Sequence, residues 1–566
     1  MNNETYYLTT PIYYVNAAPH LGSAYTTVVA DVMARFERSN GKDVWFLTGL
    51  DEHGQKIVQA AEAAGQTPQD WVDDIAPKFK QAWQALNITY NDFIRTTDER
   101  HIKGVQRFFG ELYEKGFIYK DTYRGYYCIP DETFFSDEQL AEFAEVREAE
   151  GLPSKHEDGS PLCPDCVRPL VFMEEENLFF KLSAFQQPLL DYYAAHPDFI
   201  HPEIRRNEVL SFVNSGLKDL SVSRTAFTWG VPIPFAPGHV SYVWIDALLN
   251  YLTALGYGSD EPEDQERLSK YWPAQVQFMA KDIIRFHCVI WPAMLMAAGL
   301  ELPQKIFAHG YLLTKGEKMS KSKGNAMNPY ALIEVLGVDG YRYYFIRDIE
   351  FGADGSISLE RMIQVYNADL ANSWGNLCSR ALNMTAKYLA GKTPELWEKT
   401  TERLTREMGN PLAELVNAGL QARYAAAFEA QDFSGAMDVV MGLVNAANLY
   451  IEQSAPWALA KAAEAEAEAA AAAGIDLADA KAPTEADKLA FVLYNVLESI
   501  RIIALLFAPV MPASSAEVWR RLGLGDVLAI TNQAAASEWG GLASGLDTTI
   551  GEPLFMRLAE DEIIFE

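Results

Sequence analysis

Cysteine and positive charge are both scarce in this chain, and each shortage excludes a class of protein. Five cysteines in 566 residues do not form the disulfide scaffold of a small secreted protein. Lys and Arg number 47 against 77 Asp and Glu, so the formal net charge is −30. This charge argues against binding nucleic acid by general electrostatic attraction, so local patches must hold any polyanion.

Long apolar runs and targeting signals are also lacking. The longest charge-free stretch, residues 225–245, contains Pro232, Pro234 and Pro237, so we expect no membrane-spanning segment. The N-terminus has neither the basic start nor the apolar core of a signal peptide. With 49% hydrophobic residues the composition is globular, and the length suggests about three to five domains. These features predict a soluble cytoplasmic protein that does not engage a membrane.

The first fifty residues predict a strand, a helix and a second strand. Residues 6–15 are rich in Tyr, Thr and Ile, as a buried strand would be. Apolar side chains then recur at helical spacing until a stop signal at residues 40–41. A second apolar run, residues 44–47, completes a βαβ unit and implies a parallel sheet. Such sheets bind ligands beyond the carboxyl ends of their strands, where His20 and Asp51 fall.

Changes of pattern divide the rest of the chain. Aromatic, hairpin-like sequence with two nearby cysteines interrupts the α/β pattern, and apolar strand patterns return at residues 276–280 and 305–311. Beyond about residue 366 the pattern is helical only, with an Ala- and Glu-rich stretch at 462–482 that we expect to be a solvated insertion. The predicted segments are 1–117 and 226–320 for the two halves of the sheet domain, 118–225 for the insertion, 321–366 for a linking segment and 367–566 for a helical domain.

Two short motifs suit phosphate. Residues 19–23 lie where a strand turns into a helix, and a helix start offers free N–H groups. Within them, Gly22 lets a nucleotide approach the backbone, and His20 can donate a hydrogen bond to phosphate oxygens. Residues 315–324 hold four lysines and two glycines, and a mobile loop of this kind can close over a triphosphate. Taken singly, the alternatives are a capped helix start and a solvated loop.

Together the two motifs resemble the signature pair of class I aminoacyl-tRNA synthetases, and the whole chain resembles the bacterial-type methionyl-tRNA synthetases. The supporting stretches are Thr10–Asn16, Phe46–Gly54, Tyr242–Ala247, Lys281–His287 and Ala455–Trp457. The resemblance implies an α/β Rossmann-type catalytic domain split by a zinc-knuckle-like insertion, followed by an all-α anticodon-binding domain. It also implies ATP-dependent activation of L-methionine to methionyl-adenylate and transfer of the methionyl group to the terminal adenosine of tRNA(Met).

The resemblance assigns roles to both phosphate motifs. It implies that ATP, with Mg²⁺, is bound and activated by His20, Gly22, Lys318, Ser320, Lys321 and Ser322. One departure is Ser23, where the family usually has a second histidine. A serine can still donate one hydrogen bond to an oxygen, but it carries no charge.

By the same resemblance, Asp51 binds the α-ammonium group of methionine, and a carboxylate facing an ammonium is sound electrostatics. The alternative for Asp51 is a cap on the following helix. The implied methionine pocket further comprises Ile12, Tyr14, Trp244, Ala247, Leu248, Tyr251, Ile283 and His287. The four pocket residues from 244 to 251 share one helix face by their spacing, for which core packing is the alternative.

A candidate metal site lies in the insertion. Cys163 and Cys166 have the two-residue gap of a metal knuckle, and Cys128 and Asp131 repeat it with an Asp in the last place. Family members with zinc here commonly carry four cysteines, or three and a histidine. Asp is less usual in structural sites but is a legitimate oxygen ligand, so we expect one structural Zn²⁺ held by these four residues. His156 is an alternative ligand, and reduced thiols in a site that has lost its metal are the alternative to zinc.

The resemblance implies that Asn376, Arg380 and Trp457 read the CAU anticodon. Unpaired bases stack on an indole and form hydrogen bonds along their edges, which suits these side chains. Asn372 lies four residues before Asn376, on the same expected helix face.

The expected partners are L-methionine, ATP and both initiator and elongator tRNA(Met). In so acidic a protein, tRNA affinity is expected to rest on few contacts, supplemented near the stem by residues such as Arg342 and Arg347. Family members that dimerise often carry an extra C-terminal domain. Only about residues 515–566 come after the helical region here, which predicts a monomer. The open alternatives are a synthetase for another amino acid, such as cysteine, and a non-catalytic tRNA-binding paralogue.

Overall fold

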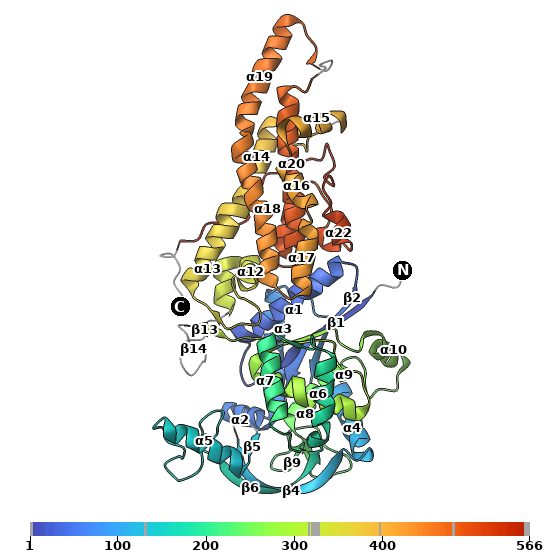
Figure 1. The fold of residues 1–566 in the computed structure, drawn as a ribbon, viewed down its shortest axis with the longest axis vertical. Coiled ribbons are helices and arrows are strands. Elements are labelled where there is room, and N and C mark those ends of the chain that lie inside the picture. Colours follow the sequence, from blue (N-terminus) through green and yellow to red (C-terminus); the bar gives the residue numbers. More distant parts are fainter. Residues whose placement is uncertain are drawn as a thin grey trace.

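An α/β region and a helical region lie end to end along the long axis of the molecule (Figure 1). The computed structural model describes residues 4–129, 133–314, 317–318, 329–395, 398–477 and 482–559. The predicted fold class, an α/β domain with an insertion followed by a helical region, is confirmed.

The α/β region is built on a six-stranded parallel sheet with the order β3-β2-β1-β11-β12-β7. Its strands are β1 (Thr5–Tyr14), β2 (Asp43–Asp51), β3 (Asp92–Arg95), β7 (Ile200–His201), β11 (Val276–Ala280) and β12 (Ile306–His309). The central strands β1 and β11 pair with Leu8 opposite Val276, and both residues are fully buried. The strand order reverses between β1 and β11, which is the point where such sheets bind ligands.

Helices cover both faces of this sheet. They are α1 (Leu21–Ser39), α2 (Gln55–Ala64), α3 (Pro68–Ala85), α4 (Glu99–Glu114), α6 (Gln186–Ala195), α7 (Glu203–Asn214), α8 (Val243–Leu248), α9 (Asn250–Thr253), α10 (Pro262–Tyr271) and α11 (Trp291–Ala298). A short antiparallel pair, β9 (Ser223–Arg224) and β10 (Val240–Ser241), precedes α8. Helix α1 ends as the sequence predicts, because Asn40 caps it and Gly41 takes the left-handed conformation with φ +84°.

The insertion forms an antiparallel sheet with the order β5-β4-β6-β8. Its elements are β4 (Ile118–Cys128), β5 (Thr133–Phe135), α5 (Asp137–Ala149), β6 (Val171–Phe180) and β8 (Leu220–Ser221). The expected boundary at residue 225 does not follow the main sheet, because β7 pairs with β12 from within the predicted insertion. A two-residue strand is too short to have a recognisable hydrophobic period, so the sequence pattern missed it.

The chain between β12 and the helical region contains β13 (Leu312–Thr314) and β14 (Glu317–Lys318), and then α12 (Pro329–Arg347) and β15 (Gly355–Ser356), which lie in the predicted linking segment 321–366. Helix α12 is kinked at Gly337, where φ is +68°.

The helical region packs around α20 (Glu485–Phe507). Its other elements are α13 (Leu359–Val365), a π-helix (Tyr366–Gly375), α14 (Asn376–Tyr388), α15 (Glu398–Met408), α16 (Pro411–Asn417), α17 (Leu420–Glu429), α18 (Phe433–Ser454), α19 (Pro456–Ala473), α21 (Pro512–Arg521) and α22 (Gln533–Ala536). Much of the Ala-rich part of α19 is exposed, as predicted, and this helix reaches the far end of the molecule in Figure 1.

One feature of the helical region differs from the sequence-based expectation of helices alone. Residues 537–559 form an irregular strap, held for example by Asn367, whose side chain donates to the Leu558 carbonyl at 2.8 Å.

Helix α20 is long and apolar enough to cross a membrane by length and composition, yet 89% of its most apolar stretch is buried inside the protein. Within it, Glu498 and Arg501 form an ion pair at 2.7 Å. Helix α20 therefore has the character of a core helix.

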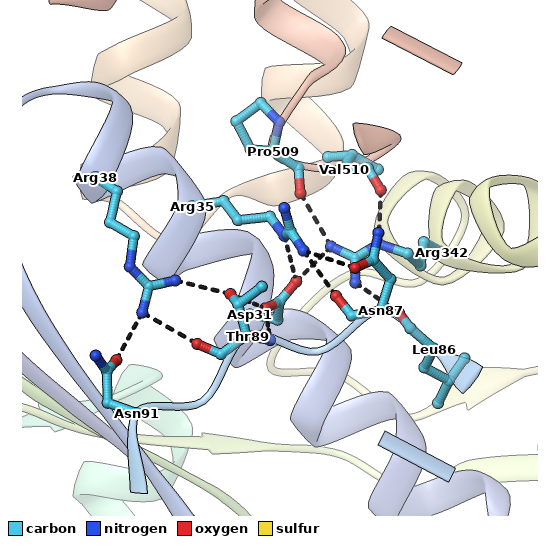
Figure 2. A network of polar contacts seen from close by, with 10 residues as sticks. All are labelled: Asp31, Arg35, Arg38, Leu86, Asn87, Thr89, Asn91, Arg342, Pro509 and Val510. Carbon is cyan, nitrogen blue, oxygen red and sulfur yellow. Dashed lines mark hydrogen bonds and ion pairs between the residues drawn. The ribbon is translucent and has the colours of Figure 1, made fainter. Parts of the chain in front are cut away.

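A buried polar network joins α1, α12 and the chain just after α20 (Figure 2). Arg342 of α12 is fully buried and donates to Asp31 Oδ2 of α1 at 2.7 Å and to the Val510 carbonyl at 2.8 Å. Asp31 also accepts from Arg35 at 2.7 Å. The expectation that Arg342 contacts the tRNA stem is therefore wrong, because its guanidinium is used inside the protein. Arg347 is half-buried and pairs with Asp369 and Asp438.

Candidate active site

A cavity of about 510 Å³ opens at the carboxyl edge of the sheet, beside the point where the strand order reverses. Its walls come from the ends of β1, β2, β11 and β12, the start of α1, and α8 and α9. It is lined by all the residues that the sequence predicted for methionine and, in the first motif, for phosphate: Ile12, Tyr14, His20, Gly22, Ser23, Asp51, Trp244, Ala247, Leu248, Tyr251, Ile283 and His287. Segments from both halves of the sheet thus meet in one cavity.

His20 caps the start of α1 through one ring nitrogen. Its Nδ1 accepts hydrogen bonds from the backbone N–H groups of Gly22, at 3.0 Å, and Ser23, at 3.3 Å. An Nδ1 atom that accepts carries no proton, so a neutral His20 ring bears its proton on Nε2. The cap and a donor role are therefore compatible, because they use different nitrogens. A Cβ atom at position 22 would lie 3.0 Å from His20 Cε1, which explains the glycine.

Ser23 completes this cap from the other side. Its hydroxyl donates to the His20 carbonyl at 2.7 Å and accepts from the His20 N–H at 3.1 Å, and the residue is buried. Because the single hydroxyl proton is already used on a backbone carbonyl, Ser23 in this arrangement supports His20 rather than donating to a phosphate.

Two carboxylates face the cavity. Asp51 is buried at the end of β2, and Asp282 follows β11. Helix α2 begins after Gly54, so Asp51 is not its N-cap residue. A buried carboxylate at this edge suits a cationic ligand group.

Aromatic rings form the apolar side of the cavity. Trp244 stacks on Phe286 with ring centroids 4.0 Å apart, and Tyr14 meets Trp244 edge-on at 6.1 Å. Such rings suit a soft, polarisable thioether. The four predicted residues from 244 to 251 all line the cavity, so the shared face is not merely core packing.

His287 is held as a neutral ring beside Tyr251. Its Nδ1 lies 3.0 Å from the Ile283 carbonyl, and its Nε2 lies 2.7 Å from the Tyr251 hydroxyl. A carbonyl only accepts, so Nδ1 carries the proton and Nε2 accepts from Tyr251. Burial lowers the pKa of His287 to about 4, which keeps the ring uncharged at neutral pH.

Sequence reasoning missed several residues of this cavity, including Thr26, Asp282 and His309. His309 ends β12, and its Nε2 lies 2.7 Å from Thr26 Oγ1 of α1. Burial lowers the pKa of His309 to about 4. The available signal was position, because Asp282 and His309 both lie at or just after the carboxyl ends of parallel strands.

The strand just before the lysine-rich motif reaches the cavity wall. Leu312, the first residue of β13, lines the cavity, and β13 pairs with β14, in which Lys318 lies opposite Leu313. The side chain of Lys318 and the residues Ser320, Lys321 and Ser322 lie outside the part of the chain that the structure describes.

Comparison with known proteins agrees with this geometry. Residues 6–382 match the family model of tRNA synthetases class I (M). Methionine–tRNA ligase from Thermotoga maritima is 43% identical over 98% of this chain and 80% of its own length, and that from Streptomyces coelicolor is 44% identical over 98% and 97%. The chain belongs to the methionyl-tRNA synthetases of class I. It is therefore a methionine–tRNA ligase and a member of an ATP-using family.

Solved methionyl-tRNA synthetases share the fold. The Mycobacterium tuberculosis enzyme in complex with methionyl-adenylate is 40% identical, with a TM-score of 0.84, over 98% of this chain and 99% of that one. Its apo form gives a TM-score of 0.79 at 36% identity, over 99% of both chains.

The insertion of this synthetase contains a cluster of thiols. The sulfur atoms of Cys128, Cys163 and Cys166 all lie within 4.8 Å of one another, and Cys128 Sγ is 3.5 Å from Cys166 Sγ. That distance exceeds a disulfide bond of about 2.05 Å, whereas thiolates on a tetrahedral Zn²⁺ lie about 3.8 Å apart. The donor set and spacing therefore fit zinc.

The fourth predicted ligand, Asp131, lies outside the described residues. The alternative ligand His156 is exposed and pairs with Asp158 at 3.2 Å, apart from the thiol cluster. The two other cysteines, Cys288 and Cys378, are buried, and burial raises the pKa of both thiols, as expected for packing residues.

The residues predicted to read the anticodon lie on the helical region. Asn376 begins α14 and is exposed, and Trp457, in the first turn of α19, is 45% exposed. Arg380 donates to Glu452 of α18 at 2.6 Å. Asn372 lies in the π-helix rather than in α14, so the single α-helical face expected for Asn372, Asn376 and Arg380 is wrong. An exposed indole of this size is a surface on which a base can stack.

Proposed function

We propose that the 510 Å³ cavity binds L-methionine and ATP and forms methionyl-adenylate. In this step a methionine carboxylate oxygen attacks the α-phosphorus of ATP, and pyrophosphate leaves. The terminal ribose hydroxyl of tRNA(Met) then attacks the acyl carbon, and AMP leaves. Neither step needs a protein nucleophile, so orientation and charge stabilisation must supply the catalysis. The convergence of all the predicted methionine residues and the first phosphate motif in one cavity carries this proposal.

At the phosphate end, the groups proposed to act belong to the start of α1 and to the lysine motif. His20 donates from Nε2 to phosphate oxygens while its Nδ1 caps the helix. Gly22 leaves room for the nucleotide, and Ser23 holds His20 in place. Lys318 and Lys321, with Ser320 and Ser322, close over the triphosphate, which enters with Mg²⁺. These groups stabilise charge that grows on the phosphates in the transition state.

At the amino-acid end, Asp51 is proposed to bind the α-ammonium group. Trp244 and Tyr14 enclose the thioether with Ile12, Ala247, Leu248, Tyr251, Ile283 and His287. Neutral His287 adds no positive charge that would repel the ammonium group.

We also propose one structural zinc ion, held by Cys128, Cys163, Cys166 and Asp131, where a closed tetrahedral set would fix the insertion.

Asn376, Arg380 and Trp457 are proposed to read the CAU anticodon of both initiator and elongator tRNA(Met). The enzyme is proposed to act as a cytoplasmic monomer.

The test is methionine-dependent exchange of pyrophosphate into ATP, with cysteine and leucine as competing substrates, followed by methionylation of a CAU-bearing transcript. Asp51→Asn should raise the KM for methionine at least tenfold. The matched control is Asp43→Asn at the opposite end of β2, where Asp43 pairs with Lys270 outside the cavity. Exchange driven better by cysteine, or equal effects of both variants, would overturn the assignment of substrate or site.

Loss of exchange in Lys321→Ala, with tRNA binding retained, would separate catalysis from RNA binding. Unchanged exchange in that variant would remove Lys321 from the catalytic set. A scattering mass of twice the chain mass would contradict the monomer.

A further inference from the structure

A buried network of one carboxylate and two imidazoles lies behind the methionine pocket. Asp246 of α8 is fully buried, and its Oδ2 lies 2.6 Å from His53 Nδ1. Its Oδ1 lies 2.7 Å from His101 Nε2 of α4. The other nitrogen of His101, Nδ1, lies 2.7 Å from Thr253 Oγ1 of α9. Four side chains from three helices and one loop are therefore joined in a single chain of hydrogen bonds.

The proton positions in this network follow from the carboxylate. Burial by itself raises the pKa of Asp246, but the attraction of His53 and the hydrogen bonds from both imidazoles outweigh it, so the pKa lies below its usual range. An ionised carboxylate only accepts, so both facing ring nitrogens donate. The second nitrogen of His101 shares a hydrogen bond with the hydroxyl of Thr253, so the network continues to α9.

Two members of the network, His53 and Asp246, are attached to the two walls of the pocket. His53 follows Asp51 by two residues, in the loop between β2 and α2. Asp246 lies on α8 between Trp244 and Ala247, both of which line the cavity. Neither Asp246 nor its two imidazole partners is among the cavity-lining residues, so the contact is made from behind.

A tryptophan holds the same loop against the rest of the domain. Trp229 donates from Nε1 to the Glu52 carbonyl at 2.6 Å and accepts from the Gly54 N–H at 3.3 Å. Its ring meets the His53 ring edge-on at 5.6 Å. The backbone on either side of His53 is thus fixed, and Asp246 sets the distance from this loop to α8.

We propose that Asp246 is a positioning residue for methionine recognition: by bonding His53 and His101 at once, it holds the Asp51 wall at a set distance from the aromatic wall. The inference rests on the proposed roles of those two walls. Replacing a buried ion pair by apolar residues is often neutral or stabilising, so this network is weak evidence of stabilisation, and its geometry carries the inference. A misplacement of about 1 Å in a binding site can cost on the order of 10²-fold in rate.

The first test is Asp246→Asn, measured by methionine-dependent pyrophosphate exchange. The amide keeps the volume, but its NH₂ group faces an imidazole N–H and the two donors repel. We expect the KM for methionine to rise roughly tenfold or more. The KM for ATP should stay within about twofold, because the network does not reach the α1 phosphate motif. The control is Asp339→Asn in α12, a buried Asp that accepts from the Ser514 N–H at 2.6 Å outside the cavity.

A second pair of variants decides the matter if Asp246→Asn does not fold. His53→Asn retains an N–H donor near the Nδ1 position, whereas His53→Leu removes it. We expect His53→Leu to raise the KM for methionine. His53→Asn should keep a KM close to that of the unmodified protein.

Three results overturn the inference. They are a wild-type-like KM for methionine in folded Asp246→Asn, an equal rise in both KM values, and no difference between the two His53 variants. If the unmodified protein shows no methionine-dependent exchange, the proposed function itself fails, which is a separate outcome.

Discussion

One ring nitrogen of His20 caps α1, and the other is left for the proposed phosphate contact. Nδ1 accepts from the first free N–H groups of α1, which leaves Nε2 to carry the proton in the neutral ring. The cap and the proposed phosphate contact can therefore be separated by substitution, because an asparagine side chain can replace Nδ1 but does not reach the Nε2 position.

We predict that His20→Asn and His20→Ala differ in stability but not in chemistry. Both should lower kcat for pyrophosphate exchange by about 10²- to 10³-fold, since both remove the Nε2–H donor. His20→Ala should also cost about 0.5–2 kcal/mol of unfolding free energy because the cap is lost. Exchange kinetics and urea unfolding measure the two effects, and retention of full kcat in His20→Asn would exclude the phosphate role.

The buried histidines predict acid sensitivity. The pKa values of His287 and His309 are lowered by burial to about 4, from about 6.5 in an unfolded chain. The unfolded state therefore binds more protons between these values. The contribution of each histidine to the unfolding free energy is fully present above about pH 6.5. It is lost as the pH falls toward 4, on the order of 3 kcal/mol for each group.

Urea unfolding from pH 7 to 4.5 checks this, with His309→Gln as the comparison. In His309→Gln the unfolding free energy should change less with pH than in the unmodified protein. An equal slope of unfolding free energy against pH in both proteins would contradict a neutral, buried His309.

The sequence located the cavity residues that belong to recognisable motifs, because those residues stand in runs with fixed spacing. It missed Thr26 and His309, which lie outside those runs, and Asp282, which lies in the Lys281–His287 run where only Ile283 and His287 were assigned to the pocket. Only the parallel pairing of β11 and β12 brings Asp282 and His309 to the same edge. Arg342 was assigned to RNA because an arginine looks the same in sequence whether it is exposed or buried.

At the scale of elements, α1 is anchored from behind by the network of Figure 2. Asp31 receives Arg342 and Arg35, and although burial raises the pKa of Asp31, these two cations outweigh it and lower the pKa to about 2. The same Arg342 donates to the Pro509 carbonyl at 3.0 Å and the Val510 carbonyl at 2.8 Å. The helix that carries the phosphate motif is thereby fastened to the helical region.

Arg342→Met should destabilise the protein by about 3–5 kcal/mol, because it leaves Asp31 buried without its main partner. The double variant Asp31→Asn/Arg342→Met should lose less than the sum of the two single variants. Chemical denaturation measures both quantities. A loss below about 1 kcal/mol for Arg342→Met would mean that the ion pair does not hold this junction.

The thiol cluster gives a prediction for the insertion. The protein as purified should contain one zinc ion per chain, and Cys163→Ser should lower this content to a small fraction. Elemental analysis measures it, with Cys378→Ser, a buried cysteine outside the cluster, as the control. Full zinc content in Cys163→Ser would exclude this site, and no zinc in the unmodified protein would favour reduced thiols.

Elements with a clear period were predictable and irregular ones were not. Strand β1 was recognised by its content of Tyr, Thr and Ile, and helix α1 by apolar residues that repeat at helical spacing. The π-helix Tyr366–Gly375 and the irregular strap at 537–559 have no such signature, since contacts with neighbouring elements define them.

At the scale of the whole molecule, the net charge of −30 sets how tRNA can be bound. Of the two arginines expected near the tRNA stem, Arg342 is buried and Arg347 is paired to two carboxylates.

We predict a shallow salt dependence, with a slope of log affinity against log salt of roughly −2 to −3, as for three or four phosphate contacts. Filter binding of a tRNA(Met) transcript between 50 and 250 mM salt measures it, and a slope steeper than about −6 would contradict sparse phosphate contacts.

The pairing of β1 with β11 also bears on how the chain is made. Thr9 and Gln277 lie side by side in the sheet but are 268 residues apart in the chain. At about 5–20 residues per second, a ribosome needs roughly 15–55 s to deliver the second strand after the first. Throughout that interval the nascent β1 has an open hydrogen-bonding edge, which invites association with other chains. Nascent fragments that stop before residue 276 should therefore be bound by chaperones more strongly than fragments that extend past β12.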